Sequence, residues 1–205
     1  MGRARGRIVR AYIGLGANVG DASATLASAL HALAASPGLR VRAVSRLYAT
    51  TPVGVLDQPG FRNAVVALDV AVPRADSPEA AASGLLVQLK DLERGFGRQQ
   101  RYRWGPREVD LDLLVFGRCA ISLARPEGGR SQDPAKAGLP LTVPHVEARR
   151  RLFVLAPLED LAPRLVPPGW GERVASAAAR QRALEGAGAA TPIATWDGAG
   201  WRSIG

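Results

Sequence analysis

The order of strand-like and helix-like segments constrains the fold of this chain most strongly. Four segments are β-prone, or alternate between apolar and polar residues as strands do, and they are residues 8–15, 41–48, 61–72 and 108–116. Leucines recur at helical spacing in two others, residues 21–36 and 77–95, and the second has serine at the cap and Pro78 at the first helical position. The resulting order is β-α-β-β-α-β.

This order predicts an α+β protein with a ferredoxin-like βαββαβ core, in which helices pack on an antiparallel sheet. A chain of 205 residues is usually one domain. We place the principal domain at residues 8–165, in which residues 145–161 form a helix in two short pieces. Residues 14–20 are predicted to form a tight loop after the first strand. The tail, residues 166–205, holds one helix candidate, Glu172–Leu184, and the sequence indicates no role for it.

The charge of the chain indicates an anionic partner. Its formal net charge is +9, and nearly all of its cationic residues are arginines, since only Lys90 and Lys136 are lysines. A nucleotide, a nucleic acid or an acidic membrane suits such a charge, but a genomic composition bias explains it equally well. No stretch approaches the roughly 20 apolar residues that span a bilayer, and Cys119 has no second cysteine with which to form a disulfide. We therefore predict a cytoplasmic protein without a membrane partner.

Two aspartates lie two positions apart in the strand-like segment 108–116. Side chains at this spacing point to one face of a strand, so Asp110 and Asp112 would lie side by side, with α-carbons roughly 6.5–7 Å apart. Neighbouring carboxylates repel each other, and a divalent cation removes that repulsion. Oxygen ligands favour Mg²⁺, which is usually shared with substrate phosphates. For the pair taken alone, a solvated polar strand face is the alternative.

Arginines immediately before the pair strengthen the metal interpretation. Arg103 and Arg107 flank Trp104-Gly105-Pro106, and a Gly-Pro turn fixes where both arginines point. Guanidinium groups bind phosphate oxygens in a bidentate manner, so arginines beside carboxylates indicate a site where phosphates and metal ions meet. These parts recur in ATP-dependent phosphoryl transfer. The alternative is an ordinary basic loop.

Two further segments suit the ligands of such a site. His145 lies at a predicted helix start and is followed by arginines at 149–151, so this segment is placed to contact phosphate or a nucleobase. Residues 50–63 are rich in turn-forming residues and include Phe61 and Asn63. An aromatic ring and an amide suit a flat heterocycle with many hydrogen-bonding groups, although turn chemistry alone would explain most of the pattern.

Together these segments resemble the 6-hydroxymethyl-7,8-dihydropterin pyrophosphokinase family. The resemblance runs from about Ala11 to Pro163, and its most specific part is the run from Arg103 to Asp112. Other matching blocks, in the family's order, are residues 12–18, 57–63 and 141–145. The resemblance implies a three-layer α/β/α fold and a magnesium-dependent enzyme that transfers diphosphate from ATP to the pterin hydroxymethyl group in folate biosynthesis. It also implies a monomer whose partners are ATP and the pterin.

The resemblance implies roles for individual residues. Asp110 and Asp112 would hold two Mg²⁺ ions as cofactors. Contacts with ATP are implied for Glu93, Arg107, Leu113, Thr142, His145 and Arg151. Phe61 and Phe153 would sandwich the pterin ring, and its edge would be hydrogen-bonded by Thr50, Asn63 and the backbone of Pro52, Val53 and Gly54. A loop that closes over both substrates would carry Trp104 and Arg98. The residues expected to act in catalysis are Arg98, Trp104, Arg107, Asp110 and Asp112.

The sequence departs from the family pattern at four positions. The departures are Lys90 for a glutamine, Gln100 for a loop arginine, Pro140 for an arginine and Val146 for an aromatic residue. Arg101, next to Gln100, either replaces the missing arginine or leaves that contact weaker. The loop at 125–138 is longer than usual, and the sequence indicates no role for it.

Two other functional classes fit parts of the sequence. The glycines in 14–20 approach a dinucleotide-binding fingerprint, but no Asp or Glu lies between Asp21 and Asp57 to hold a ribose about 20 positions on. An NADP site could instead use Arg42 or Arg46. A basic ferredoxin-like sheet also suits RNA, but aromatic residues are only 5% of the chain and the aspartate pair would repel phosphates. We therefore predict no nucleic-acid partner.

Overall fold

The computed structural model describes residues 6–51, 59–97, 107–130 and 138–204. Its strands are β1 (Arg7–Ala17), β2 (Leu39–Val44), β3 (Leu47–Thr50), β4 (Phe61–Val72), β5 (Asp110–Phe116), β6 (Ile121–Leu123), β7 (Leu141–Val143), β8 (Ala190–Trp196) and β9 (Trp201–Ser203). Its helices are α1 (Ala22–Ala35), α2 (Pro78–Gly95), α4 (Leu152–Leu161) and α5 (Val174–Glu185). Short 3-10 helices lie at Glu127–Gly129, Ala148–Arg150 and Ala187–Ala189.

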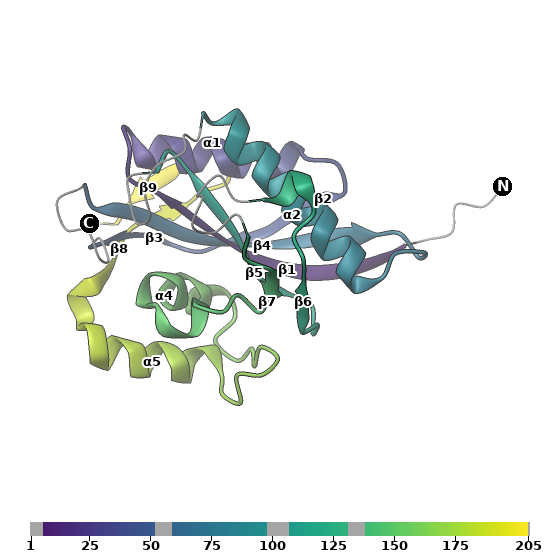
Figure 1. Cartoon of the computed structure of the whole chain (residues 1–205). Helices are drawn as coiled ribbons and strands as arrows, with labels where there is room; N and C mark the ends of the chain where they lie inside the picture. Colours follow the sequence, from purple (N-terminus) through teal and green to yellow (C-terminus); the bar gives the residue numbers. More distant parts are fainter. Residues whose placement is uncertain (1–5, 52–58, 98–106, 131–137, 205) are drawn as a thin grey trace.

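A seven-stranded antiparallel sheet forms the middle of three layers. Its order is β5-β1-β4-β3-β8-β9, with β2 also paired to β4, while β6 and β7 form a separate small sheet. Figure 1 shows α1 and α2 on one face of the sheet and α4 and α5 on the other. The arrangement of β1, β4, β5 and the β2/β3 pair is the ferredoxin-like one, so the predicted α+β class and its three layers are confirmed.

Local sequence signals explain the two helices of the core. Ser77 accepts a hydrogen bond from the Ala80 amide at 3.1 Å, so the predicted serine cap is present, and Asp21 caps α1 by accepting from the Ala24 amide at 3.0 Å. The buried residues of both helices include leucines that belong to the main hydrophobic core, namely Leu26, Leu30, Leu33, Leu85, Leu86 and Leu89. Within the described ranges, no helix combines the length and apolar composition needed to cross a bilayer.

The predicted strand at 41–48 is broken into β2 and β3. Ser45 lies at the break, where its backbone N–H donates to the Val65 carbonyl and its hydroxyl accepts from the Val65 N–H, both at 2.9 Å. Arg46, the next residue, is directed to α4 on the far side of the sheet. The side-chain hydroxyl of Ser45 thus replaces one link of the ladder, and a single uninterrupted strand was the wrong prediction here.

The predicted loop at residues 14–20 is also wrong in its first half. Gly14 and Gly16 belong to β1, which continues to Ala17, because β4 pairs with it on one side and β5 on the other. Glycine weakens an isolated strand, but ladders on both sides outweigh that preference. These glycines therefore lie inside the sheet with a strand on each side, and they do not form the glycine-rich loop of a dinucleotide site.

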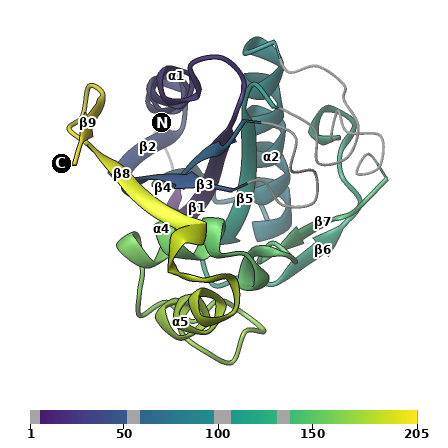
Figure 2. The same ribbon diagram turned by 90° about the vertical axis from the view of Figure 1, so that its left-hand side faces the viewer.

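The tail joins the sheet, as Figure 2 shows for β8 beside β3. Its predicted helix appears as α5, packed against α4, and the strands β8 and β9 were not predicted. The β8–β9 hairpin reaches α1, where the Trp201 indole N–H donates to the Ser23 carbonyl at 3.1 Å. The division of the chain at residue 165 stays a prediction, although β8 shares a sheet with the core.

Candidate active site

A pocket lies between the sheet and the start of α4. It is lined from β1, β3, β4 and β5 on the sheet side, and by Arg151, Phe153 and Val154 on the α4 side. Eight residues that the sequence singled out line it together: Thr50, Phe61, Asn63, Arg107, Asp110, Asp112, Arg151 and Phe153. They come from segments up to a hundred positions apart, which the topology brings to one face.

The floor of the pocket is made by the glycines of β1. Gly16 is paired with Asn63 on one side and Asp110 on the other, and Gly14 is flanked in the same way by Val65 and Asp112. A Cβ atom at Gly16 would lie 2.9 Å from the Asn63 side-chain oxygen, so the residue there must be glycine for Asn63 to occupy its place. The bare backbone leaves an open strip between the amide and the two carboxylates.

The two aspartates line the pocket side by side, as strand alternation predicts. Their side chains are 11% exposed for Asp110 and 35% for Asp112. The Arg107 guanidinium donates to Asp110, and the Lys90 ammonium lies 4.0 Å from an Asp112 oxygen. Each carboxylate thus has a cation beside it, which offsets the repulsion between two partly buried negative charges.

Asn18 joins the end of β1 to both flanking segments and was missed as a site residue. It is 3% exposed, and its side-chain oxygen accepts from the Arg107 amide at 2.8 Å while its amide donates to the Pro59 carbonyl at 3.0 Å. A buried amide with both groups bonded fixes the backbone where Arg107 begins its approach to Asp110. The signal available in the sequence was an asparagine directly after the glycine-rich strand end.

On the opposite side of the pocket, polar groups lie beside aromatic rings. The Asn63 amide donates to the Thr50 hydroxyl at 2.7 Å, and the two residues are 7% and 6% exposed. Phe61 and Phe153 also line the pocket, and the Arg151 guanidinium carbon lies 5.7 Å from the centre of the Phe153 ring. This side therefore offers apolar faces and a short row of hydrogen-bonding groups to a flat ligand.

The remaining residues that are predicted to contact ATP lie in two different places. Thr142 and His145 line a neighbouring open groove of about 840 Å³, and the His145 amide donates to the Leu114 carbonyl of β5 at 2.9 Å. Leu113 and Glu93 lie on the α2 face of the sheet. Of the other predicted residues, Arg98, Trp104, Pro52, Val53 and Gly54 lie outside the described residues.

Glu93 is engaged inside the protein, where it is 1% exposed. One of its oxygens accepts from the Leu111 amide at 2.6 Å and from the Lys90 ammonium at 2.6 Å, and Lys90 also donates to the Leu111 carbonyl at 3.0 Å. This buried pair holds α2 against β5 directly behind the aspartates. Contact between Glu93 and a ribose would require its neighbours to move.

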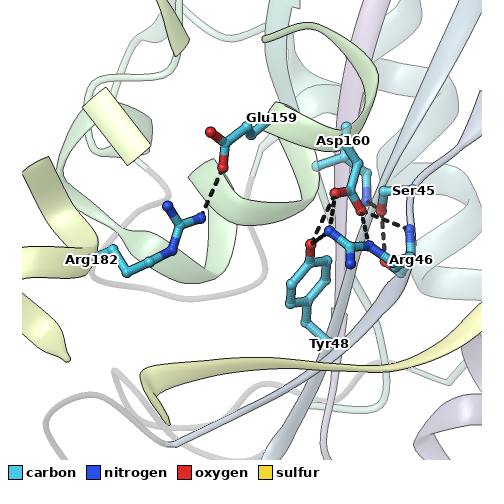
Figure 3. A network of polar contacts seen from close by, with 7 residues as sticks. Ser45, Arg46, Tyr48, Glu159, Asp160 and Arg182 are labelled. Carbon is cyan, nitrogen blue, oxygen red and sulfur yellow. Dashed lines mark hydrogen bonds and ion pairs between the residues drawn. The ribbon is translucent and has the colours of Figure 1, made fainter. Parts of the chain in front are cut away.

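Side chains from distant segments hold α4 over the sheet, as Figure 3 shows. Asp160 accepts from the Arg46 guanidinium at 2.6 and 3.0 Å, from the Arg46 backbone amide at 3.1 Å and from the Tyr48 hydroxyl at 3.0 Å. Burial, followed by the charge of Asp160, raises the pKa of Tyr48, while the hydrogen bond that Arg46 donates to Asp160 raises the pKa of Arg46. Tyr48 therefore stays protonated and keeps donating to Asp160.

The sequence of the chain matches known proteins over most of its length. The family model described as 7,8-dihydro-6-hydroxymethylpterin-pyrophosphokinase matches residues 12–163. A Methylorubrum extorquens protein named 2-amino-4-hydroxy-6-hydroxymethyldihydropteridine pyrophosphokinase is 41% identical over 170 residues, which cover 83% of this chain and 93% of the relative. A Pseudomonas aeruginosa protein of the same name is 39% identical over 161 residues, or 78% of this chain and 85% of the relative.

Solved structures share the fold. Wild-type Plasmodium falciparum HPPK-DHPS with STZ-DHP gives a TM-score of 0.70 at 15% identity, and the match covers 98% of this chain and 49% of that chain. The same protein with pteroate gives 0.68 at 16% identity, covering 97% and 48%. This likeness supports the ferredoxin-like architecture, and this chain spans about half the length of those proteins. From the family model and the two relatives, the chain belongs to the 7,8-dihydro-6-hydroxymethylpterin-pyrophosphokinase family.

Proposed function

We propose that this protein transfers the diphosphate of ATP to the hydroxymethyl group of 6-hydroxymethyl-7,8-dihydropterin, a step of folate biosynthesis that yields AMP and the pterin diphosphate. The observation that carries the proposal is the pocket in which paired carboxylates and arginines adjoin two phenylalanines. The groups that suit phosphates and the groups that suit a flat heterocycle line the same pocket. The names of the relatives point to the same reaction.

The apolar side of the pocket is the proposed pterin site. Phe61 and Phe153 would stack on the two faces of the ring, and Thr50 and Asn63 would bond its edge. A buried polar edge left unpaired costs about 1–3 kcal/mol, so a ring without matching donors and acceptors is rejected. The backbone of Pro52, Val53 and Gly54 is proposed to complete this edge.

Two Mg²⁺ ions are proposed to bind at Asp110 and Asp112. The donor set fits, because both side chains offer hard oxygen ligands to the pocket, and Mg²⁺ usually keeps waters and substrate phosphates in its other positions. Among the described residues no cluster of three or more His, Cys, Asp or Glu side chains could form a fuller cage. When bound, Mg²⁺ supplies neutralisation of the phosphate charge and of the charge that develops on the pterin oxygen.

The arginines are proposed to orient the triphosphate. Arg107 lies beside Asp110 at one border of the pocket and Arg151 lies at the other, so their guanidinium groups can hold phosphate oxygens from two directions. Thr142 and His145, in the neighbouring groove, would contact the rest of ATP. Arg98 and Trp104 are proposed to act from a loop that closes on the substrates, and Leu113 and Glu93 to border the nucleotide from behind β5.

In the proposed reaction the pterin hydroxyl oxygen bonds to the β-phosphorus of ATP, and the hydroxyl proton is released to solvent water. The bond from that phosphorus to the oxygen bridging to the α-phosphate breaks, and AMP leaves with that oxygen. The protein contributes chiefly by positioning the two substrates and by placing fixed positive charge around the transferred group. We further propose that the enzyme works as a monomer and that it works in the cytoplasm. The single cysteine of the chain suits the second part, because a reducing compartment does not favour disulfides.

Release of AMP tests the proposal. Wild type should form AMP from ATP only when both 6-hydroxymethyl-7,8-dihydropterin and Mg²⁺ are present, and Asp112→Ala should reduce the rate by about 1,000-fold or more. Asp69→Ala is the matched control. Asp69 lies on β4, pairs with Arg10 and Arg42, and does not line the pocket. Formation of ADP in place of AMP, or full activity in Asp112→Ala, would contradict the proposal.

A further inference from the structure

The segment from Glu185 to Ala190 touches both walls of the pocket. At its first residue, a Glu185 oxygen accepts from the Leu152 amide at 3.0 Å, and Leu152 is the first residue of α4. At its last residue, Ala190 pairs with Thr50 at the end of β3. Thr50 lines the pocket from the sheet side, and the neighbours of Leu152 in the sequence, Arg151 and Phe153, line it from the α4 side.

The Glu185 carboxylate supplies what the start of α4 lacks. The cap residue of α4 is Arg151, whose side chain makes no capping hydrogen bond. The first amides of a helix need acceptors from outside the helix, and a carboxylate suits them because the N-terminus carries partial positive charge. The Gln181 amide donates to the same Glu185 oxygen at 2.7 Å, so the carboxylate is held in place from α5.

Packing beneath this contact connects the two walls. Leu152 and Ala156 of α4 form one buried cluster with Tyr48 of β3 and Ala190 of β8. The position of the α4 start relative to β3 is therefore set partly by this cluster and partly by the Glu185 contact. Glu185 is itself exposed, so replacing it opens no cavity in the core.

The other end of α4 is held by different groups. Asp160 bonds to Arg46 and Tyr48, and Glu159 accepts from Arg182 of α5 at 2.8 Å. Figure 3 shows both contacts at this end of the helix. Arg182 and Glu185 thus link α5 to opposite ends of α4, and the described pocket lining includes the start of α4 and not residues 159 and 160.

We propose that Glu185 is a positioning residue for the active site. By capping the start of α4, its carboxylate sets where Phe153 and Arg151 lie relative to Thr50 and the sheet. It thereby sets the affinity for the pterin without touching it. The substrate part of this inference rests on the proposed function, and the cap itself does not.

The test compares Glu185→Ala and Glu185→Gln with Arg182→Ala as a matched control on the same helix pair. Loss of a cap changes an equilibrium by about five-fold, so Glu185→Ala should raise the KM for the pterin by about that factor and change kcat less. Glu185→Gln keeps an oxygen acceptor for Leu152 and should restore the KM. Arg182→Ala removes a link at the far end and should leave the KM unchanged.

Hydrogen exchange of the Leu152 amide, followed by NMR without substrate, separates this inference from the proposed function. Exchange should be about five-fold faster in Glu185→Ala, and unchanged in Glu185→Gln and Arg182→Ala. That pattern would support the cap even if wild type formed no AMP, an outcome that contradicts the proposed function instead. Equal KM changes in Glu185→Ala and Arg182→Ala, or Leu152 exchange that is unaffected by Glu185→Ala, would overturn the inference.

Discussion

The two walls of the pocket are built by different means. On the sheet wall, main-chain pairing on both sides of β1 fixes the row Asn63, Gly16 and Asp110. On the α4 wall, side chains hold the helix from far along the chain: Arg46 and Asp160 are 114 positions apart, and Leu152 and Glu185 are 33 positions apart. The carboxylates of Asp110 and Asp112, which are proposed to bind metal, lie on the first wall, and the aromatic ring of Phe153 lies on the second.

This difference determines what a single substitution can do. Apart from proline, which has no N–H to donate, a changed side chain leaves the backbone ladder in place, so the sheet wall is altered mainly at its surface groups or by placing a side chain where glycine is required. The α4 wall depends on a few side-chain contacts, and removing one of them can shift the end of the helix that it holds. We therefore expect a single substitution to displace the α4 wall more readily than the sheet wall.

Loss of the Asp160 carboxylate should produce the largest change in stability. Asp160→Ala leaves the Arg46 amide and the Tyr48 hydroxyl without their acceptor, and we expect the free energy of unfolding to fall by about 2 kcal/mol, after allowing for the exposure of Arg46. Urea unfolding measures this change. Asp69→Ala removes a carboxylate shared by Arg10 and Arg42 on the sheet, and it should lower the free energy of unfolding by less. A larger decrease for Asp69→Ala than for Asp160→Ala would contradict the expected difference between the sheet and α4.

Tyr48, which is buried and donates to Asp160, should make the free energy of unfolding depend on pH in alkaline solution. The pKa of Tyr48 is raised above its ordinary value of 10.0, so the folded protein holds the phenol proton more tightly than the unfolded chain does. This stabilisation is complete below pH 10 and is lost as the pH rises through the folded pKa. Unfolding free energies measured between about pH 9 and 12 should fall more steeply for wild type than for Asp160→Ala.

A substitution at Gly16 tests the sheet wall at its floor. In Gly16→Ala the added Cβ would lie 2.9 Å from the Asn63 oxygen, so Asn63 must move and its bond to Thr50 is disturbed. Overpacking of this kind costs about 1–2 kcal/mol. Pterin binding, measured by calorimetry, should weaken by about ten-fold. Gly84→Ala serves as the control, because Gly84 lies on α2 with open space beside it. This substitution should lower neither the stability nor the affinity for the pterin.

The smallest effect is expected far from the pocket, in the β8–β9 turn. Hydrogen bonds from the Ala199 and Gly200 amides, with Arg202 beside them, lower the pKa of Asp197 to about 2. A lowered pKa contributes stability above the ordinary value of 3.8, and the contribution is lost as the pH falls through 2. The difference in Tm between wild type and Asp197→Asn should therefore shrink between about pH 5 and pH 2; a constant difference would show that the charge of Asp197 does not matter.

The contrast between the walls also explains how far the sequence could be interpreted. Alternation in 108–116 placed Asp110 and Asp112 on one face, and the cap at Ser77 followed from residue types within one turn of the helix. Such signals are local. Continuation of the strand through Gly16 was not predictable in the same way, because β4 and β5 supply the pairing that overrides the local preference of glycine.

Long-range side-chain contacts were beyond a single sequence for the same reason. The bond between Asn18 and Arg107 joins residues 89 positions apart, and no property of either residue alone specifies the other. The strand β8 likewise lacks strong alternation, and it is formed by pairing with β3 on one side and β9 on the other. The burial of Glu93 behind β5 could not be anticipated either, since it depends on Lys90 and on the Leu111 amide.

One pair of variants tests most directly whether the two walls of the pocket have separate roles. Asp112→Asn and Phe153→Ala are compared for AMP formation, for pterin affinity and for Mn²⁺ binding as a spectroscopic substitute for Mg²⁺. Asp112→Asn should lose about 1,000-fold in turnover and weaken Mn²⁺ binding while binding the pterin almost as wild type does. Phe153→Ala should bind the pterin about ten-fold more weakly and bind Mn²⁺ normally. If both variants lose pterin affinity and metal binding to the same extent, the walls do not act separately and the account is contradicted.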